Sequence, residues 1–139
     1  MHAFVGSILE NQTVAYGEVE PFLNQYGFVV GGGWETDHGY FDLKLKDRPG
    51  YLYLRIPAFV QAGHFGDGDA TLKLGTPFML HHQYKRGVDE EANPSVLLAS
   101  MNQFAKPEEE DAPLTEEDIN AGEAVLKQVE EGFRRTFLT

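Results

Sequence analysis

The chain has 139 residues, 42% of them hydrophobic, a length and composition typical of one globular domain with a packed core. It has no cysteine, which excludes disulfides, thiolate metal ligands and cysteine nucleophiles. The net charge of −11 is concentrated in residues 89–139, which hold 13 acidic and 4 basic residues, and such a chain repels phosphate backbones and anionic membranes. We therefore expect no binding to nucleic acid or to membranes. The lack of a basic and apolar leader at the N-terminus favours a cytoplasmic protein.

The first part of the chain predicts a short strand followed by a short helix. Residues 3–9 are partly apolar and favour a strand. Apolar residues at helical spacing then indicate a helix over residues 18–26: Val19, Phe22, Leu23 and Tyr26. Pro21 suits the first turn of such a helix, where its missing N–H costs nothing, and Gly27 suits a left-handed stop.

The middle of the chain predicts an antiparallel meander built around a hairpin. Apolar and polar residues alternate through 40–46 and again through 51–56, and Asp-Arg-Pro-Gly at 47–50 suits the turn between them. One side of this hairpin is apolar: Phe41, Leu43, Leu45, Leu52, Leu54 and Ile56. The other side is polar but rich in rings: Tyr40, Asp42, Lys44, Lys46, Tyr51, Tyr53 and Arg55. Residues 70–74 and 77–80 are expected to add further strands.

Two helices are expected after the sheet. The first covers residues 93–104, and an acidic connector at about 106–114 separates it from the second. Thr115 and Asp118 have the spacing of a capping box at the start of the second helix. Its apolar stripe follows helical spacing: Ile119, Gly122, Leu126, Val129 and Phe133. The predicted fold is α+β, a mostly antiparallel sheet of about five strands with a short N-terminal helix and two C-terminal helices packed on it.

The ring-rich side of the hairpin is the strongest candidate for a functional surface. Strand pairing would bring its tyrosines beside a carboxylate and a guanidinium, and rings with a few charges suit a ligand or partner surface. The candidate binding residues are Trp34, Tyr40, Asp42, Tyr51, Tyr53, Arg55 and His82. Several interpretations stay open: the last helix covers this side, the side is an ordinary solvated sheet face, it is a dimer interface, or it borders a small-molecule pocket.

Other motifs carry weaker indications of function. Gly31–Gly33 is not followed by the basic residue of a phosphate loop, so it indicates a strand bend, a bulge or a close backbone approach. His81 and His82 are adjacent and would point to opposite sides of a strand, which is poor geometry for sharing a metal. The histidine and aspartates of residues 64–69 suit a turn better than a metal site. We therefore assign no metal ligand, no catalytic residue and no cofactor.

Blocks of sequence spread over most of the chain carry a family resemblance. They are Gly27-Phe28-Val29 with Gly31-Gly32-Gly33-Trp34, Asp37-His38-Gly39-Tyr40-Phe41-Asp42, Tyr53-Leu54-Arg55-Ile56-Pro57, Leu74-Gly75-Thr76-Pro77-Phe78 with His82-Gln83-Tyr84, and Asn102-Gln103-Phe104 with Pro107 and Asp111. In this order the blocks resemble the YugN-like family of small Bacillus-type proteins. The resemblance implies a cytoplasmic bacterial protein and offers no catalytic residues to carry over.

Two functional hypotheses follow from these patterns. The favoured one is a non-enzymatic interaction or regulatory protein that forms a symmetric homodimer and contacts another protein through its ring-rich side or its acidic C-terminal half. The acidic half is otherwise a solvated, solubilising surface. The alternative is a small-ligand-binding protein or an enzyme in which Arg55 and nearby tyrosines hold an anion while a histidine transfers a proton.

Overall fold

The structure is a computed structural model that describes residues 1–31, 37–46, 50–84, 107–109 and 112–138. Its elements in chain order are β1 (His2–Ala3), β2 (Thr13–Ala15), α1 (Tyr16–Asn24), β3 (Val29–Gly31), β4 (His38–Lys46), β5 (Tyr51–Ala62), β6 (Thr71–Leu74), β7 (Phe78–Tyr84), β8 (Pro107–Glu109) and α3 (Glu116–Phe137). Neither described helix combines the length and the apolar composition that crossing a membrane requires.

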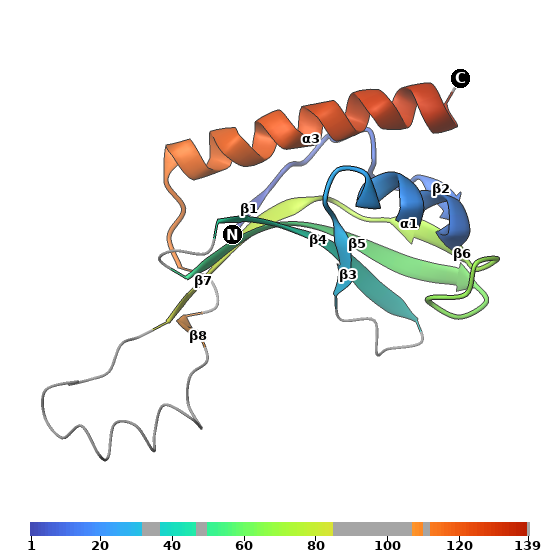
Figure 1. The fold of residues 1–139 in the computed structure, drawn as a ribbon, viewed down its shortest axis with the longest axis horizontal. Helices are drawn as coiled ribbons and strands as arrows, with labels where there is room; N and C mark the ends of the chain where they lie inside the picture. The colour runs from blue at the N-terminus through green and yellow to red at the C-terminus, as the bar shows by residue number, and fades with distance from the viewer. Residues whose placement is uncertain (32–36, 47–49, 85–106, 110–111, 139) are drawn as a thin grey trace, which may run out of the picture.

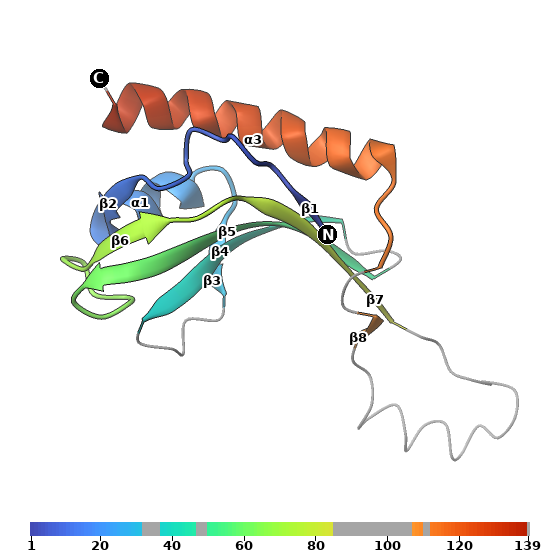
Figure 2. The ribbon, with the colours of Figure 1, turned by 180° about the vertical axis from the view of Figure 1, so that it is seen from behind.

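The described strands form an eight-stranded antiparallel sheet with β5 at its centre. Its main order is β1-β7-β5-β4-β3, while β6 pairs with β5 and β2, and β8 pairs with β7. Both α1 and α3 lie on the same side of the sheet, and the opposite side carries no described helix (Figures 1 and 2). The α+β class and the antiparallel sheet are as predicted, but the prediction of about five strands missed the short β2 and β8.

The core lies between the sheet and its helices. Leu52, Leu54 and Ile56 of β5 are each at most 2% exposed, and they face the helices together with Phe41 of β4 and Met79 of β7. The apolar side of the predicted hairpin is therefore the covered side. The predicted pairing of β4 with β5 is confirmed, with Phe41 opposite Ile56.

Helix α1 begins earlier than its sequence pattern predicts, at Tyr16. No side chain caps it; the backbone N–H groups of Tyr16 and Gly17 instead donate to carbonyl oxygens of the loop before β6, at 2.9 Å each. This earlier start places Pro21 inside the helix rather than in its first turn, which corrects the prediction. The predicted stop at Gly27 is confirmed by a φ of +97°.

Helix α3 matches its prediction closely. Thr115 and Asp118 form the capping box, and Gly122, Leu126, Val129 and Phe133 are buried. The glycine at 122 leaves room for the Met79 side chain, and Gly132 does the same for the Tyr26 ring, so the helix lies close to its neighbours at both positions. The other predicted C-terminal helix, residues 93–104, lies outside the described residues.

Two further predictions need correction. The predicted strand over residues 3–9 shortens to β1, because the chain turns after Phe4. Lys46 was expected on the ring-rich side, but a register shift between Lys44 and Lys46 places Lys46 opposite Leu52. Its ammonium there lies 2.8 Å from the Asp118 carboxylate of α3.

Candidate functional site

The side of the sheet away from the helices gathers side chains from three neighbouring strands. We call it the open face and define it by Tyr40, Asp42 and Lys44 of β4, Tyr51, Tyr53 and Arg55 of β5, and Phe78, Leu80 and His82 of β7. Antiparallel register places these residues directly opposite one another, with Arg55 between Asp42 and Phe78, and Tyr53 between Lys44 and Leu80. Asp42 is buried, Lys44 is exposed, and the other seven residues are partly exposed.

An ion pair lies at the centre of the open face. Arg55 donates from Nε to Oδ1 of Asp42 at 2.8 Å and from Nη2 to Oδ2 at 2.9 Å, a bidentate pair. The Tyr40 ring covers the guanidinium, with 4.5 Å between the ring centroid and Cζ. A side chain at Gly31 would begin 2.7 Å from Oδ2 of Asp42, so this glycine makes room for the carboxylate.

The pair is shielded, and the charge of each partner offsets that of the other. Asp42 is only 8% exposed as a residue. Burial alone would lower the pKa of Arg55, but the hydrogen bond and the charge of Asp42 outweigh it and raise that pKa. The guanidinium therefore stays charged and paired.

A ring cluster lies next to this ion pair. The rings of Tyr51 and Tyr53 have centroids 6.1 Å apart, and the His82 ring meets Tyr53 edge-on at 5.8 Å. The Lys44 ammonium lies 5.0 Å from the centroid of the Tyr51 ring. Burial raises the pKa of Tyr53, the charge of Asp42 adds to the rise, and Arg55 partly opposes it. The Tyr53 phenol is therefore neutral at physiological pH.

This geometry bears directly on the anion-binding hypothesis. Arg55 gives Nε–H and one N–H of Nη2 to Asp42, so this pair of donors is taken, and an incoming carboxylate or phosphate would have to use the N–H groups of Nη1 and the second N–H of Nη2. A groove on the described part of the chain is formed by the N-terminal segment and α3, and none of its lining residues belongs to the open face. What the open face offers is a broad, ring-rich contact surface.

The structure brings most of the predicted site residues together. Tyr40, Asp42, Tyr51, Tyr53, Arg55 and His82 all belong to the open face, whereas Trp34 lies outside the described residues. Sequence reasoning missed Phe78 and Leu80, although their alternation with buried Met79 was visible. The register of β7 against β5 was the missing information, because it alone places them beside Arg55 and Tyr53.

The weaker motifs serve structural roles where they are described. His81 is 8% exposed, faces the helix side and lies 3.0 Å from the Pro113 carbonyl, so it points away from His82. The loop after β5 is a turn in which the N–H of Asp67 donates to the carbonyl of His64. No group of three or more His, Asp or Glu side chains close enough to hold a metal occurs within the described ranges.

Comparison with known proteins gives relatives over nearly the whole chain. The model of the YugN-like family matches residues 4–133. The uncharacterized protein YugN of Bacillus subtilis (strain 168) is 37% identical over 127 residues, which cover 91% of this chain and 95% of that protein. The uncharacterized protein YlbA of the same strain is 28% identical over 89 residues, covering 64% and 74% respectively.

A solved structure shares the fold. The crystal structure of YugN from Geobacillus kaustophilus HTA426 aligns with a TM-score of 0.73 and covers 97% of each chain. The two sequences are 24% identical, so the likeness establishes the common architecture alone.

Proposed function

The chain belongs to the YugN-like family, and we propose that it is a non-enzymatic interaction module that self-associates through the open face. One observation carries this proposal. The rings of Tyr40, Tyr51 and Tyr53 and the side chains of Phe78 and Leu80 remain partly exposed, and both described helices lie on the other side of the sheet. Contiguous exposed apolar surface is typical of protein interfaces.

The composition of the open face favours an interface over an ordinary solvated sheet face. Antiparallel sheets that face water on one side usually alternate apolar with polar residues, so their outer side carries few large apolar groups. Here the outer side carries rings and aliphatic groups, and its border adds Val29 and Phe59, which are 57% and 48% exposed. Tyrosine and phenylalanine with arginine are the residues enriched in interface cores.

Charge favours a second copy of the chain as the partner. Asp42 offsets Arg55, so Lys44 leaves the open face with a net charge of +1 when His82 is neutral, within a chain of −11. The exposed charged residues of α3 sum to −1, because Lys127, Arg134 and Arg135 offset three of its four exposed glutamates: Glu116, Glu117, Glu123 and Glu131. Two open faces packed about a two-fold axis bring together surfaces that carry no excess of negative charge.

Light scattering after size-exclusion chromatography tests the proposal. The unchanged chain should run as a dimer at micromolar concentration, and Tyr53→Glu should weaken dimerisation at least about tenfold because it removes a ring from the centre of the open face and puts a carboxylate there that dimerisation would desolvate. Val5→Glu adds the same charge at a residue that is 83% exposed and outside the open face, and it should leave the dimer intact. A strict monomer, or equal effects of the two substitutions, would contradict the proposal.

A second protein partner is tested in the same variants. Pull-downs from a native lysate should recover a partner with the unchanged chain and with Val5→Glu, and lose it with Tyr53→Glu. Recovery of the same protein by all three baits would place that contact outside the open face, and recovery of nothing at low and moderate salt would argue against such a partner.

A further inference from the structure

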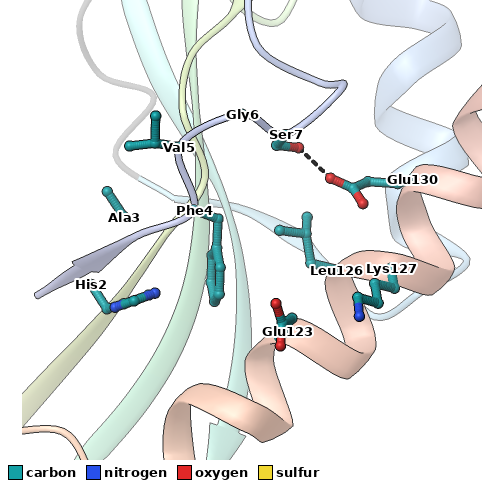
Figure 3. A pocket seen from close by; sticks show the side chains of 10 residues that line it. All are labelled: His2, Ala3, Phe4, Val5, Gly6, Ser7, Glu123, Leu126, Lys127 and Glu130. Carbon is teal, nitrogen blue, oxygen red and sulfur yellow. Dashed lines mark hydrogen bonds between the residues drawn. The ribbon is translucent and has the colours of Figure 1, made fainter.

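A groove lies on the helix side of the molecule, between the N-terminal segment and α3 (Figure 3). Residues 2–7 form one wall, and the α3 residues from Glu123 to Glu130 form the other. Its volume of about 360 Å³ falls within the range of roughly 300–1,000 Å³ that small-molecule sites occupy. The groove is on the opposite side of the sheet from the open face, so it is independent of the proposed interface.

The groove has an apolar part. Leu126 is only 3% exposed and lies between the two walls with the Phe4 ring (Figure 3). The His2 ring meets Phe4 edge-on, with centroids 4.9 Å apart, which holds the Phe4 ring beside the helix. These groups could cover the hydrocarbon part of a small ligand.

The polar part of the groove comes from one side of α3. Glu123 and Glu130 are seven residues apart, about two helical turns, so their carboxylates lie along the same side of the helix. The Ser7 hydroxyl donates to Oε2 of Glu130 at 2.6 Å and holds this carboxylate at the groove (Figure 3). A carboxylate accepts several hydrogen bonds, so Glu130 keeps capacity for a further donor. Lys127 is the cationic residue on the same stretch of helix.

We propose that this groove binds a small amphipathic amine. Its ammonium donates to Glu130, and its hydrocarbon part lies against the partly exposed Phe4 ring. Carboxylates outnumber the lysine on this stretch of α3, and charge-assisted hydrogen bonds from an ammonium to a carboxylate are among the strong ones. An amine is therefore preferred to an acid of the same shape.

Calorimetric titration with 2-phenylethylamine and 3-phenylpropionate separates these two ligand classes. The amine should bind and the acid should not. Glu130→Gln should weaken amine binding about tenfold, the loss of affinity expected for one charge-assisted hydrogen bond. Lys127→Gln should tighten amine binding, because it removes a like charge from the groove. Glu131→Gln changes the same charge one residue along and outside the groove, and it should leave the affinity unchanged.

Structural damage is controlled within the same set of variants. In Glu130→Gln the side-chain carbonyl can still accept the hydrogen bond from Ser7. Ser7→Ala keeps the charge of Glu130 but no longer holds its carboxylate at the groove, so this variant should also weaken amine binding. Circular dichroism checks that each variant is folded. Absence of amine binding at millimolar concentration, equal binding of amine and acid, or equal affinities of the Glu130 and Glu131 variants would overturn the proposal.

Discussion

Gly39 leaves a space that the Phe65 ring fills. A Cβ at this position would lie 2.5 Å from Cζ of Phe65, and the ring packs edge-on against Tyr16 with centroids 5.3 Å apart. Gly39→Ala should therefore displace the ring and lower the free energy of unfolding by about 1–3 kcal/mol, the usual cost of overpacking. Urea unfolding at neutral pH measures the change.

Gly68→Ala is the matched control, because a Cβ at Gly68 meets nothing within 4 Å. In addition, the cost of Gly39→Ala should shrink when Phe65 is replaced by alanine, since the clash then has no partner. A cost of Gly39→Ala that is unchanged in the Phe65→Ala background would show that the ring is not its cause.

The Asp42–Arg55 pair should contribute to stability as well as to the open face. Asp42→Asn leaves a partly buried guanidinium without its counter-charge, and the free energy of unfolding should fall by about 2 kcal/mol. Asp37→Asn removes an aspartate whose side chain is 82% exposed and pairs with His38, so its effect should stay within about 0.5 kcal/mol. Comparable losses in the two variants by chemical denaturation would mean that the pair has no special role.

Helix α3 is tied to the sheet at its first turn by Asp118. Its carboxylate accepts a hydrogen bond from the N–H of Thr115, and its own N–H donates to the Thr115 hydroxyl. The Lys46 ammonium of β4 lies 2.8 Å from the same carboxylate. Burial opposes its ionisation, but the hydrogen bonds from Lys46 and Thr115 outweigh that cost, and the pKa of Asp118 is lowered from its ordinary 3.8. The folded state therefore binds this proton less readily than the unfolded chain.

The stability that Asp118 contributes should depend on pH in one direction. It is fully present above the ordinary pKa of 3.8 and is lost as the pH falls through the lower folded-state pKa. At neutral pH, Asp118→Asn should lower the free energy of unfolding by about 1–2 kcal/mol, and the difference from the unchanged chain should narrow below pH 3.8. Denaturation at a series of pH values checks this; a difference that widens in acid would refute the assignment, and exposed Glu117→Gln provides the control.

Local patterns predicted the elements, while distant contacts decided their limits. The capping box, the stripe of α3 and the stop at Gly27 were predictable because each depends on residues within a few positions. The start of α1 was not, because its first N–H groups bond to carbonyls of Gly68 and Ala70, more than fifty residues away. The side on which Lys46 lies depends on a bulge and on an ion pair with the distant Asp118, and the alternating pattern of the strand indicates neither of them.

At the scale of the whole molecule, the sequence predicted two unlike sides of the sheet but not which of them the helices cover. Apolar Leu52, Leu54 and Ile56 made the helix side the better candidate, yet tyrosines also occur in cores. Only the packing of α3 against Met79 and its neighbours removes that alternative for the described residues. The family itself was predictable, because its sequence blocks are spread over most of the chain.

Footprinting of the tyrosines tests most directly whether two open faces meet. Tyr40, Tyr51 and Tyr53 lie on the open face and Tyr16 and Tyr26 on the helix side, and all are partly exposed, so one labelling reaction compares both sides of the sheet. As the protein concentration rises through the micromolar range, oxidation by hydroxyl radicals should fall at the open-face tyrosines and stay constant at Tyr16 and Tyr26. Constant labelling of all five tyrosines, or protection of Tyr16 and Tyr26 instead, would contradict the proposed interface.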